Sequence, residues 1–337
     1  RQMCIRDRRY TWPSAAGNYV LLFDGEDFHT LRVADGGRAK LTEDLDTGFA
    51  DKQYDVPTDM LPPYGVGGWL ENDEAVLLYD RYDVWRVAPD GTSPSRITRG
   101  AAEGIQHRVE DLDEDEVALD PQQPLYLWTW SERSGKRGYA RLDPGADSAE
   151  SLFFVDKMPG RTTKAEEADV FVLTLEAVDD SPDFFVGGPD LADLRQVTNT
   201  NPFQDDYAWT RSELFHFDSE AGVPLQAALY YPVNHDPSRR YPLIVWTYEK
   251  ETPWMHIYDV PDEGDYYNFT TWTQRGYFVM LPDIAYRPRD PGVCAIEAVR
   301  PAIGAVVERG LVDAARVGLV GHSWGGYQAA YLPTRTK

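Results

Sequence analysis

Residues 317–332 read VGLVGHSWGGYQAAYL, where an apolar run, a serine between two glycines and a helix-forming run follow one another without a gap. The run 317–320 has the composition of a buried strand. This order predicts a nucleophile elbow, a sharp turn that presents the hydroxyl of Ser323 between a strand and a helix. A side chain at Gly321 or Gly325 would collide with neighbouring backbone in such a turn, so we expect glycine at both positions.

The elbow also predicts how a reacting carbonyl would be stabilised. A helix that begins directly after Ser323 points its first N–H groups and its positive dipole end at the reacting centre, and both favour an oxyanion. We therefore expect the backbone N–H of Trp324 to be one oxyanion donor. The adjacent His322 is interpreted as a packing residue, because the base that activates a serine approaches from a separate loop. The other five histidines all precede the serine: His29, His107, His216, His235 and His256.

Strand signals of two kinds precede the elbow, from about residue 205 onward. A hairpin is predicted from residues 214–217 and 225–231, which are separated by a glycine-containing turn. Two continuous apolar runs, at 243–246 and 277–281, are typical of strands covered on both faces in a parallel sheet.

A helix signal lies between the second of these runs and the elbow. Apolar residues between 294 and 309 fall on one face at helical spacing, after the opening signal Asp290-Pro291-Gly292. Pro301 is expected to kink this helix or to remove one of its hydrogen bonds. Strands that alternate with helices in this way predict an α/β architecture for the C-terminal part of the chain.

A different pattern recurs four times between residues 17 and 198. Each copy has an apolar and aromatic run, a polar turn and a second alternating run. The first runs begin at Tyr19, Ala75, Leu125 and Val170, and the copies close at Thr42, Thr98, Asp143 and Thr198. Runs this short predict antiparallel strands, and a repeat of roughly 45 to 56 residues is typical of β-propeller blades.

Propeller blades must stack on one another, because a single blade cannot bury both of its faces. A complete ring usually has more than four blades, so we expect only part of a propeller in this chain. A β-sandwich is the alternative architecture for the same strand pattern. The expected organisation is a non-native extension at residues 1–8, a partial propeller at 9–205 and the N-terminal part of an α/β-hydrolase catalytic domain at 206–337.

Composition restricts the classes of partner. The formal net charge is −23, and an acidic surface repels nucleic acid and anionic lipid, so neither is an expected partner. Cys4 and Cys294 are too few for a disulfide framework, and no apolar run is long enough for a transmembrane helix. The acidic run 110–116 lacks the glycine and the spaced ligands of a calcium loop, so it is interpreted as a solvated loop.

The segment 213–332 resembles the N-terminal half of the catalytic domain of the prolyl oligopeptidase family of serine peptidases, which are α/β-hydrolases. The preceding repeats resemble the β-propeller of that family, so the resemblance covers nearly the whole chain after residue 9. It rests on four stretches, namely LQAALYYP at 225–232, RGYFVMLPD at 275–283, VDAARVGL at 312–319 and GHSWGGY at 321–327.

The resemblance implies two further features of the site. A tyrosine that follows the strand opened by Tyr-Pro-Leu-Ile-Val supplies a second oxyanion donor in that family, and Tyr248 stands at the matching position. Many members continue with glycines, whereas this chain continues with Glu249-Lys250-Glu251. The family's catalytic Asp and His follow the serine by more residues than this chain contains, so we expect the polypeptide by itself to be nearly inactive.

Three functions fit the sequence. The first is a peptidase that cleaves oligopeptides through an acyl-enzyme on Ser323, with the propeller restricting entry to small or unfolded substrates. The second is an esterase or acyl hydrolase, because the elbow determines the chemistry but not the acyl group. The third is a propeller-based binding protein with a degenerate hydrolase part. No cofactor or metal is implied, and the sequence does not determine cleavage specificity, oligomeric state or localisation, whether cytoplasmic, periplasmic or secreted.

Overall fold

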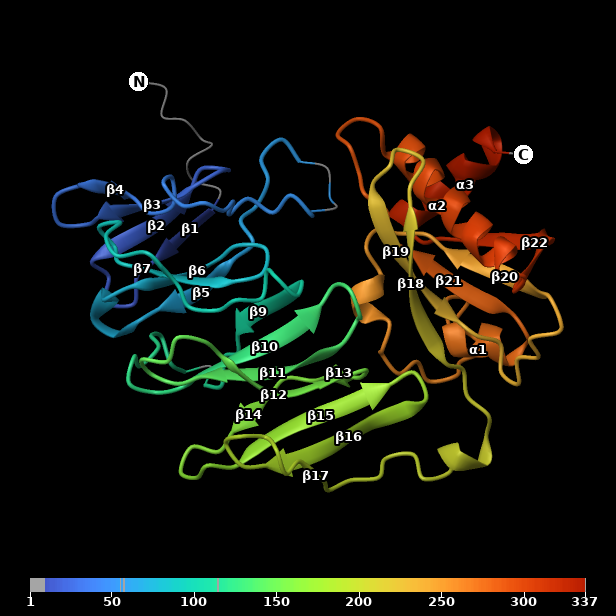
Figure 1. Cartoon of the computed structure of the whole chain (residues 1–337), viewed down its shortest axis with the longest axis horizontal. Coiled ribbons are helices and arrows are strands. Elements are labelled where there is room, and N and C mark those ends of the chain that lie inside the picture. The colour runs from blue at the N-terminus through green and yellow to red at the C-terminus, as the bar shows by residue number, and fades with distance from the viewer. Residues whose placement is uncertain (1–9, 55, 57, 114, 337) are drawn as a thin grey trace.

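The computed structural model describes residues 10–54, 56, 58–113 and 115–336. Cys4 and the extension expected at residues 1–8 lie outside this part of the chain. The described residues form four antiparallel sheets and one mixed sheet, and three α-helices accompany the mixed sheet (Figure 1). The four antiparallel sheets follow one another along one side of the molecule, and the mixed sheet with its helices occupies the other side (Figure 1).

The first two sheets each contain four strands in sequence order. The first sheet is formed by β1 (Tyr10–Pro13), β2 (Tyr19–Phe23), β3 (Phe28–Arg32) and β4 (Arg38–Lys40). The second sheet is formed by β5 (Val66–Trp69), β6 (Val76–Tyr79), β7 (Val84–Val87) and β8 (Ser95–Arg96).

The next two sheets repeat this arrangement. The third sheet is formed by β9 (Ile105–Val109), β10 (Leu125–Ser131), β11 (Arg137–Leu142) and β12 (Glu150–Val155). The fourth sheet is formed by β13 (Met158–Pro159), β14 (Thr163–Lys164), β15 (Phe171–Ala177), β16 (Asp180–Gly187) and β17 (Arg195–Gln196), and both β13 and β14 pair with β15.

All four hairpins predicted from the repeated pattern are confirmed as antiparallel pairs, namely β2–β3, β6–β7, β10–β11 and β15–β16. The predicted first run is not the first strand of any of these sheets, because one shorter or more polar strand precedes it in three sheets and two short strands, β13 and β14, precede it in the fourth. In the second sheet this strand is β5, whose glycines and register shift hide the alternation that marks a strand.

Alternate residues of one strand bury themselves against different neighbouring sheets. Leu78 of β6 packs with residues of the first sheet, whereas Leu77 packs with residues of the third sheet. In the same way Leu127 of β10 faces the second sheet and Tyr126 faces the fourth. The second and third sheets therefore each lie between two others, as stacked blades do and as the two sheets of a β-sandwich do not.

The threonine that closes three of the four copies makes a repeated hydrogen bond. In the second sheet, Thr98 Oγ1 donates to Asp83 Oδ1 at 2.8 Å and accepts the backbone N–H of Val84 at 2.9 Å. The same two bonds recur at the same spacing in the first and fourth sheets, with the pairs Thr42–Asp27 and Thr198–Asp183. This interaction links the last strand of the sheet to the hairpin, which explains why these copies close on threonine.

The mixed sheet has the strand order β18-β19-β21-β20-β22. Its strands are β18 (Ser212–Asp218), β19 (Pro224–Tyr230), β20 (Tyr241–Trp246), β21 (Phe278–Pro282) and β22 (Val312–Val320). The predicted hairpin is the antiparallel pair β18–β19, and β20 runs parallel to both β21 and β22. The helices are α1 (Phe269–Gln274), α2 (Pro291–Glu308) and α3 (Trp324–Arg335), and Pro301 lies inside the continuous α2.

Both faces of the mixed sheet are covered, as the continuous apolar runs predicted. One face packs against α2 and α3, and its cluster includes Met280 of β21 and Cys294 of α2, which is a buried free thiol. The opposite face packs against α1, and its cluster includes Val279 of β21 together with Met255 and with Val178 of the fourth sheet. The second face therefore joins the mixed sheet to the antiparallel sheets.

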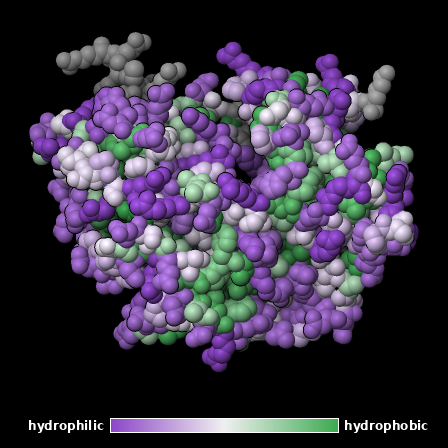
Figure 2. Space-filling view, viewed as in Figure 1, coloured by the Kyte–Doolittle hydropathy of each residue, from purple (hydrophilic) through white to green (hydrophobic). Residues whose placement is uncertain are grey.

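The outer surface is mainly hydrophilic, with a hydrophobic area near the fourth sheet (Figure 2). That sheet and the turns beside it carry exposed apolar side chains at Val170, Phe184 and Val197. Within the described ranges, no helix combines the length and the apolar character needed to span a membrane.

Candidate active site

Ser323 occupies the turn between the end of β22 and the start of α3. Its backbone has φ 51° and ψ −111°, a conformation that is costly for a residue with a side chain. The residue is exposed, although it lies at the junction of two packed elements. Strain of this kind is typical of the serine in a nucleophile elbow, where the turn holds the hydroxyl away from the sheet.

The two flanking glycines are positions of close backbone approach. A Cβ at Gly321 would lie 2.2 Å from the carbonyl oxygen of Gly325, and a Cβ at Gly325 would lie 1.9 Å from the carbonyl oxygen of Thr247. Real carbon–oxygen contacts are about 3.3 Å or longer, so neither position accepts a side chain without movement of the backbone. The turn at Ser323 therefore depends on both glycines.

Trp324 is the first residue of α3, so its backbone N–H belongs to the first turn, whose N–H groups have no partner within the helix. The indole Nε1 of the same residue donates to the Tyr286 hydroxyl at 3.1 Å, and the indole stacks on the Tyr327 ring at 5.3 Å between centroids. These contacts hold the indole in place while the backbone N–H points out of the helix end.

The Tyr248 ring lies beside the elbow. A Cβ at Gly325 would be 3.2 Å from Cδ2 of that ring, so the position matched by family resemblance is next to the turn that carries Ser323. The Tyr248 carbonyl oxygen accepts two hydrogen bonds of 2.6 Å, from the Tyr286 hydroxyl and from Gln328 Nε2. The backbone that carries the Tyr248 ring is therefore fastened to the first turns of α3.

Sequence reasoning gave no role to Tyr286 or Gln328. Gln328 lies one helical turn after Trp324, and its side chain is fully buried. This spacing places the side chains of Trp324 and Gln328 on the same face of α3. The spacing was the only signal in the sequence that these two residues could share a partner.

Asp283 fastens the chain that follows Tyr248. Its carboxylate, directly after β21, accepts the backbone N–H groups of Glu251 at 2.9 Å and Thr252 at 3.0 Å, and the Thr252 hydroxyl at 2.6 Å. Burial raises the pKa of Asp283, and these hydrogen bonds oppose that increase. Asp283 directly follows a buried strand, and functional polar side chains of α/β sheets gather at the carboxyl ends of such strands. That position was the signal by which the sequence could have indicated this residue.

His322, the residue before the candidate nucleophile, packs against an aromatic ring. The His322 side chain is exposed and its ring lies edge-on to Tyr267, at 5.7 Å between centroids. Among the described residues, no side chain makes a hydrogen bond to the Ser323 hydroxyl. The described residues also contain no group of three His, Cys, Asp or Glu side chains that could hold a metal ion.

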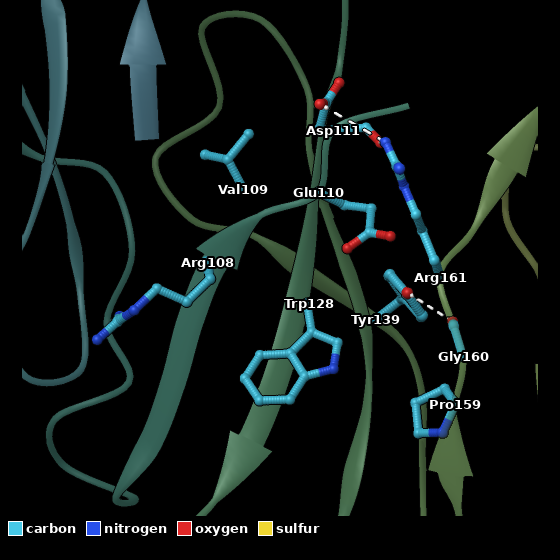
Figure 3. A pocket seen from close by; sticks show the side chains of 9 residues that line it. All are labelled: Arg108, Val109, Glu110, Asp111, Trp128, Tyr139, Pro159, Gly160 and Arg161. Atoms are coloured by element: carbon cyan, nitrogen blue, oxygen red, sulfur yellow. Dashed lines mark hydrogen bonds and ion pairs between the residues drawn. The ribbon is translucent and has the colours of Figure 1, made fainter. Parts of the chain in front are cut away.

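A separate cavity of about 650 Å³ opens between the third and fourth sheets (Figure 3). Glu110 and Trp128 point toward it, and Arg161 closes one side through an ion pair of 3.6 Å with Asp111 (Figure 3). The Arg108 side chain points away from them, and its Nη2 donates to the backbone oxygens of Asp80 and Arg81. Burial raises the pKa of Glu110, and a hydrogen bond from the backbone N–H of Thr162 opposes the increase. The lining contains none of the elbow residues, so this cavity is distinct from the candidate site.

Several solved structures that share this fold are peptidases. The puromycin-hydrolyzing peptidase of Mycobacterium tuberculosis matches 97% of this chain and 51% of its own, with a TM-score of 0.62 and 16% identity. The acylaminoacyl peptidase of Pyrococcus horikoshii matches 98% and 50%, with a TM-score of 0.58 and 13% identity. Dipeptidyl peptidase 4 of Porphyromonas gingivalis matches 97% and 66%, with a TM-score of 0.51 and 14% identity.

These structures are peptidases of the prolyl oligopeptidase type, so the resemblance inferred from the sequence is confirmed at the level of the fold. In sequence, the chain is 26% identical over 156 residues to the Arabidopsis thaliana protein named "Probable glutamyl endopeptidase, chloroplastic". That match covers 41% of this chain and 16% of the plant protein, and the chain spans about half the length of the first two structures above. No protein-family model matches the sequence.

Proposed function

We propose that this chain belongs to a serine-type peptidase that hydrolyses oligopeptides through an acyl-enzyme on Ser323. The observation that carries the proposal is the strained backbone of Ser323 between β22 and α3. A serine in an ordinary turn adopts unstrained backbone angles. In a nucleophile elbow, the strained angles expose the serine hydroxyl at the positive end of a helix dipole.

The geometry supports the following sequence of bond changes. The Ser323 oxygen attacks the scissile carbonyl carbon while its proton passes to a base, and the carbonyl oxygen becomes an oxyanion. The backbone N–H of Trp324 and the hydroxyl of Tyr248 are the proposed donors to this oxyanion. Collapse of the intermediate breaks the carbon–nitrogen bond as the amine takes the proton, and water then hydrolyses the acyl-serine by the same steps.

The base is proposed to be the histidine of an Asp–His pair that follows this sequence in the longer protein. No described residue bonds to the Ser323 hydroxyl, so the 337 residues alone are expected to be inactive. We also propose that residues 9–205 form a partial propeller that restricts access to peptides, and that residues 206–337 begin the catalytic domain. The stacked sheets and the doubly covered mixed sheet support this division.

The test uses the full-length protein that contains this sequence. A fluorophosphonate probe should label Ser323, as mapped by mass spectrometry, and Ser323→Ala should abolish the label. Ser238→Ala, in an exposed loop where the hydroxyl bonds to Asp236, is the matched control and should leave labelling unchanged. A wild-type protein that hydrolyses peptides without labelling Ser323 would contradict the proposal. Turnover of p-nitrophenyl esters without turnover of peptide amides would assign it to the esterases instead.

A further inference from the structure

The chain that follows Tyr248 runs along the antiparallel sheets. We call residues 249–258 the bridging segment. Near its start, Lys250 Nζ donates to the backbone oxygen of Gln53 and to the Gln53 side-chain oxygen at 3.3 Å, between the first and second sheets. Near its end, the N–H of Tyr258 donates to Glu176 of the fourth sheet at 3.1 Å. The segment is therefore attached near its start to the loop between the first and second sheets and at its end to the fourth sheet.

The third sheet contacts the middle of the bridging segment through the turn between β10 and β11. Gly135 occupies the tip of that turn with φ +75°, and a Cβ there would lie 3.1 Å from Met255 Sδ and 3.5 Å from His256 Nε2. An L side chain is strained at this φ and would also press on the bridging segment. The turn therefore fits closely against the segment.

Arg137, at the start of β11, also contacts the bridging segment. Its Nη2 donates to the backbone oxygen of Pro253, and its guanidinium lies over the rings of Trp128 and Trp130, at 4.9 Å and 5.4 Å from their centroids. The side chain is 3% exposed. No carboxylate in the described part of the chain forms an ion pair with it, so its charge is directed at a backbone carbonyl and two aromatic faces.

A buried guanidinium without a carboxylate is costly, and burial lowers the pKa of Arg137 to about 10. The group is still charged at neutral pH. A charged donor makes a stronger hydrogen bond to a carbonyl than a neutral donor does, and the tryptophan faces offset part of the cost of burial. A side chain that only filled this space would not need a charge.

The opposite side of the bridging segment is attached to the candidate site. Asp283 holds the N–H groups of Glu251 and Thr252, immediately before the residue that Arg137 holds. Tyr286 and Gln328 hold the carbonyl of Tyr248 a few residues earlier. A displacement of Pro253 would therefore be carried through a short and tightly bonded stretch of backbone to the Tyr248 ring.

We propose that Arg137 is a positioning residue for Tyr248: the third sheet fixes the proposed oxyanion donor through the Arg137–Pro253 hydrogen bond. The inference rests on the proposed function of Ser323 and Tyr248. It gives the antiparallel sheets a part in the reaction besides restricting access, because one of their side chains acts on the geometry of the site.

A double-mutant cycle in the full-length protein tests this positioning role. Tyr248→Phe should lower kcat by roughly 10²–10³-fold, as loss of an oxyanion donor does. Arg137→Met should lower kcat by roughly tenfold with KM nearly unchanged, because it misplaces a donor without touching the substrate. In the Tyr248→Phe background the same Arg137→Met change should alter kcat by less than about twofold, because the donor it positions is already absent.

Three controls separate positioning from general damage. Arg141→Met, on the same strand but paired with Asp143 at 3.0 Å, should leave kcat unchanged. Arg137→Lys, which keeps the charge and a donor but loses the planar group that stacks on Trp128 and Trp130, should retain more kcat than Arg137→Met. If Arg137→Met does not fold, as judged by its thermal unfolding, Arg137→Gln enters the same cycle with the same expected direction.

Hydrogen exchange gives a readout that does not depend on turnover. The amides of Glu251 and Thr252 should exchange faster in Arg137→Met than in Arg141→Met. Unchanged exchange, an unchanged kcat, or an equal loss of kcat in both backgrounds would overturn the positioning role. Failure of the probe to label wild-type Ser323 would instead overturn the proposed function, so the two failures are distinguishable.

Discussion

Gly325 and Thr247 are in backbone contact, so close that a Cβ on Gly325 would lie 1.9 Å from the Thr247 carbonyl oxygen. The Thr247 hydroxyl also donates to the carbonyl oxygen of Gly325 at 3.3 Å. This contact joins the first turn of α3 to the end of β20, immediately before Tyr248. The two proposed oxyanion donors, on either side of the contact, are therefore held in a fixed relation.

Gly325→Ala is expected to destabilise the protein by about 1–3 kcal/mol or more, because the added methyl group must displace backbone rather than a flexible side chain. Chemical denaturation measures this change. Gly304→Ala in α2 is the matched control, because a Cβ there meets no atom within 4 Å. Alanine is favoured over glycine inside a helix, so the control should stabilise the protein by about 0.5–1 kcal/mol. Stability changes of the same sign in the two variants would contradict the close backbone contact at Gly325.

Tyr286→Phe is expected to lower stability by about 1–3 kcal/mol. The hydroxyl donates to the Tyr248 carbonyl oxygen and accepts from Trp324 Nε1, so its removal leaves a donor and an acceptor with fewer partners. Tyr277→Phe is the control, since the Tyr277 hydroxyl bonds to no described residue and its ring packs on Trp272. Urea denaturation of both variants should show a loss of stability for Tyr286→Phe only. Equal losses would mean that the hydrogen bonds of the Tyr286 hydroxyl do not stabilise the protein.

Thr98→Val should cost about 1–3 kcal/mol, because it leaves the buried carboxylate of Asp83 and the N–H of Val84 each without one hydrogen bond. The same change at Thr92, whose hydroxyl bonds to Asp90 at 2.6 Å in an exposed turn, should cost less than about 0.5 kcal/mol. Thermal unfolding of the two variants makes the comparison. A small effect at Thr98 would mean that the repeated threonine does not stabilise the sheet.

His256 is expected to make stability depend on pH. Burial, and to a lesser degree the charge of Arg137, lowers its pKa below the ordinary value of 6.5. As the pH falls below about 6.5 the unfolded chain takes up a proton that folded His256 resists, so the free energy of unfolding decreases until the folded pKa is reached.

Denaturation midpoints at pH 7 and pH 5.5 test this linkage. The decrease between the two pH values should be smaller in His256→Gln and in His256→Phe than in the wild type, because both variants lack the titrating group. A decrease of the same size in all three proteins would show that His256 does not contribute.

Much of the local structure could be predicted from the sequence. The hairpins and α2 have periodic apolar patterns, the parallel strands have continuous apolar runs, and all of these elements are present. Short strands such as β1 and β5 were missed because a strand of four residues has too few positions to establish a pattern. The placement of Ser323 between a strand and a helix followed from the order of three local signals.

The sequence by itself determined the hairpins, α2 and the order of strand, turn and helix around Ser323, because each of these depends on residues close together in the chain. Only the tertiary structure decided that Arg137 meets Pro253, a contact between residues 116 positions apart, and that Tyr286 and Gln328 converge on Tyr248. No periodicity connects such residues, since their meeting depends on how whole sheets pack. The arrangement around the proposed nucleophile is therefore a property of the packed molecule, whereas the motif from which Ser323 is proposed is visible in a few consecutive residues.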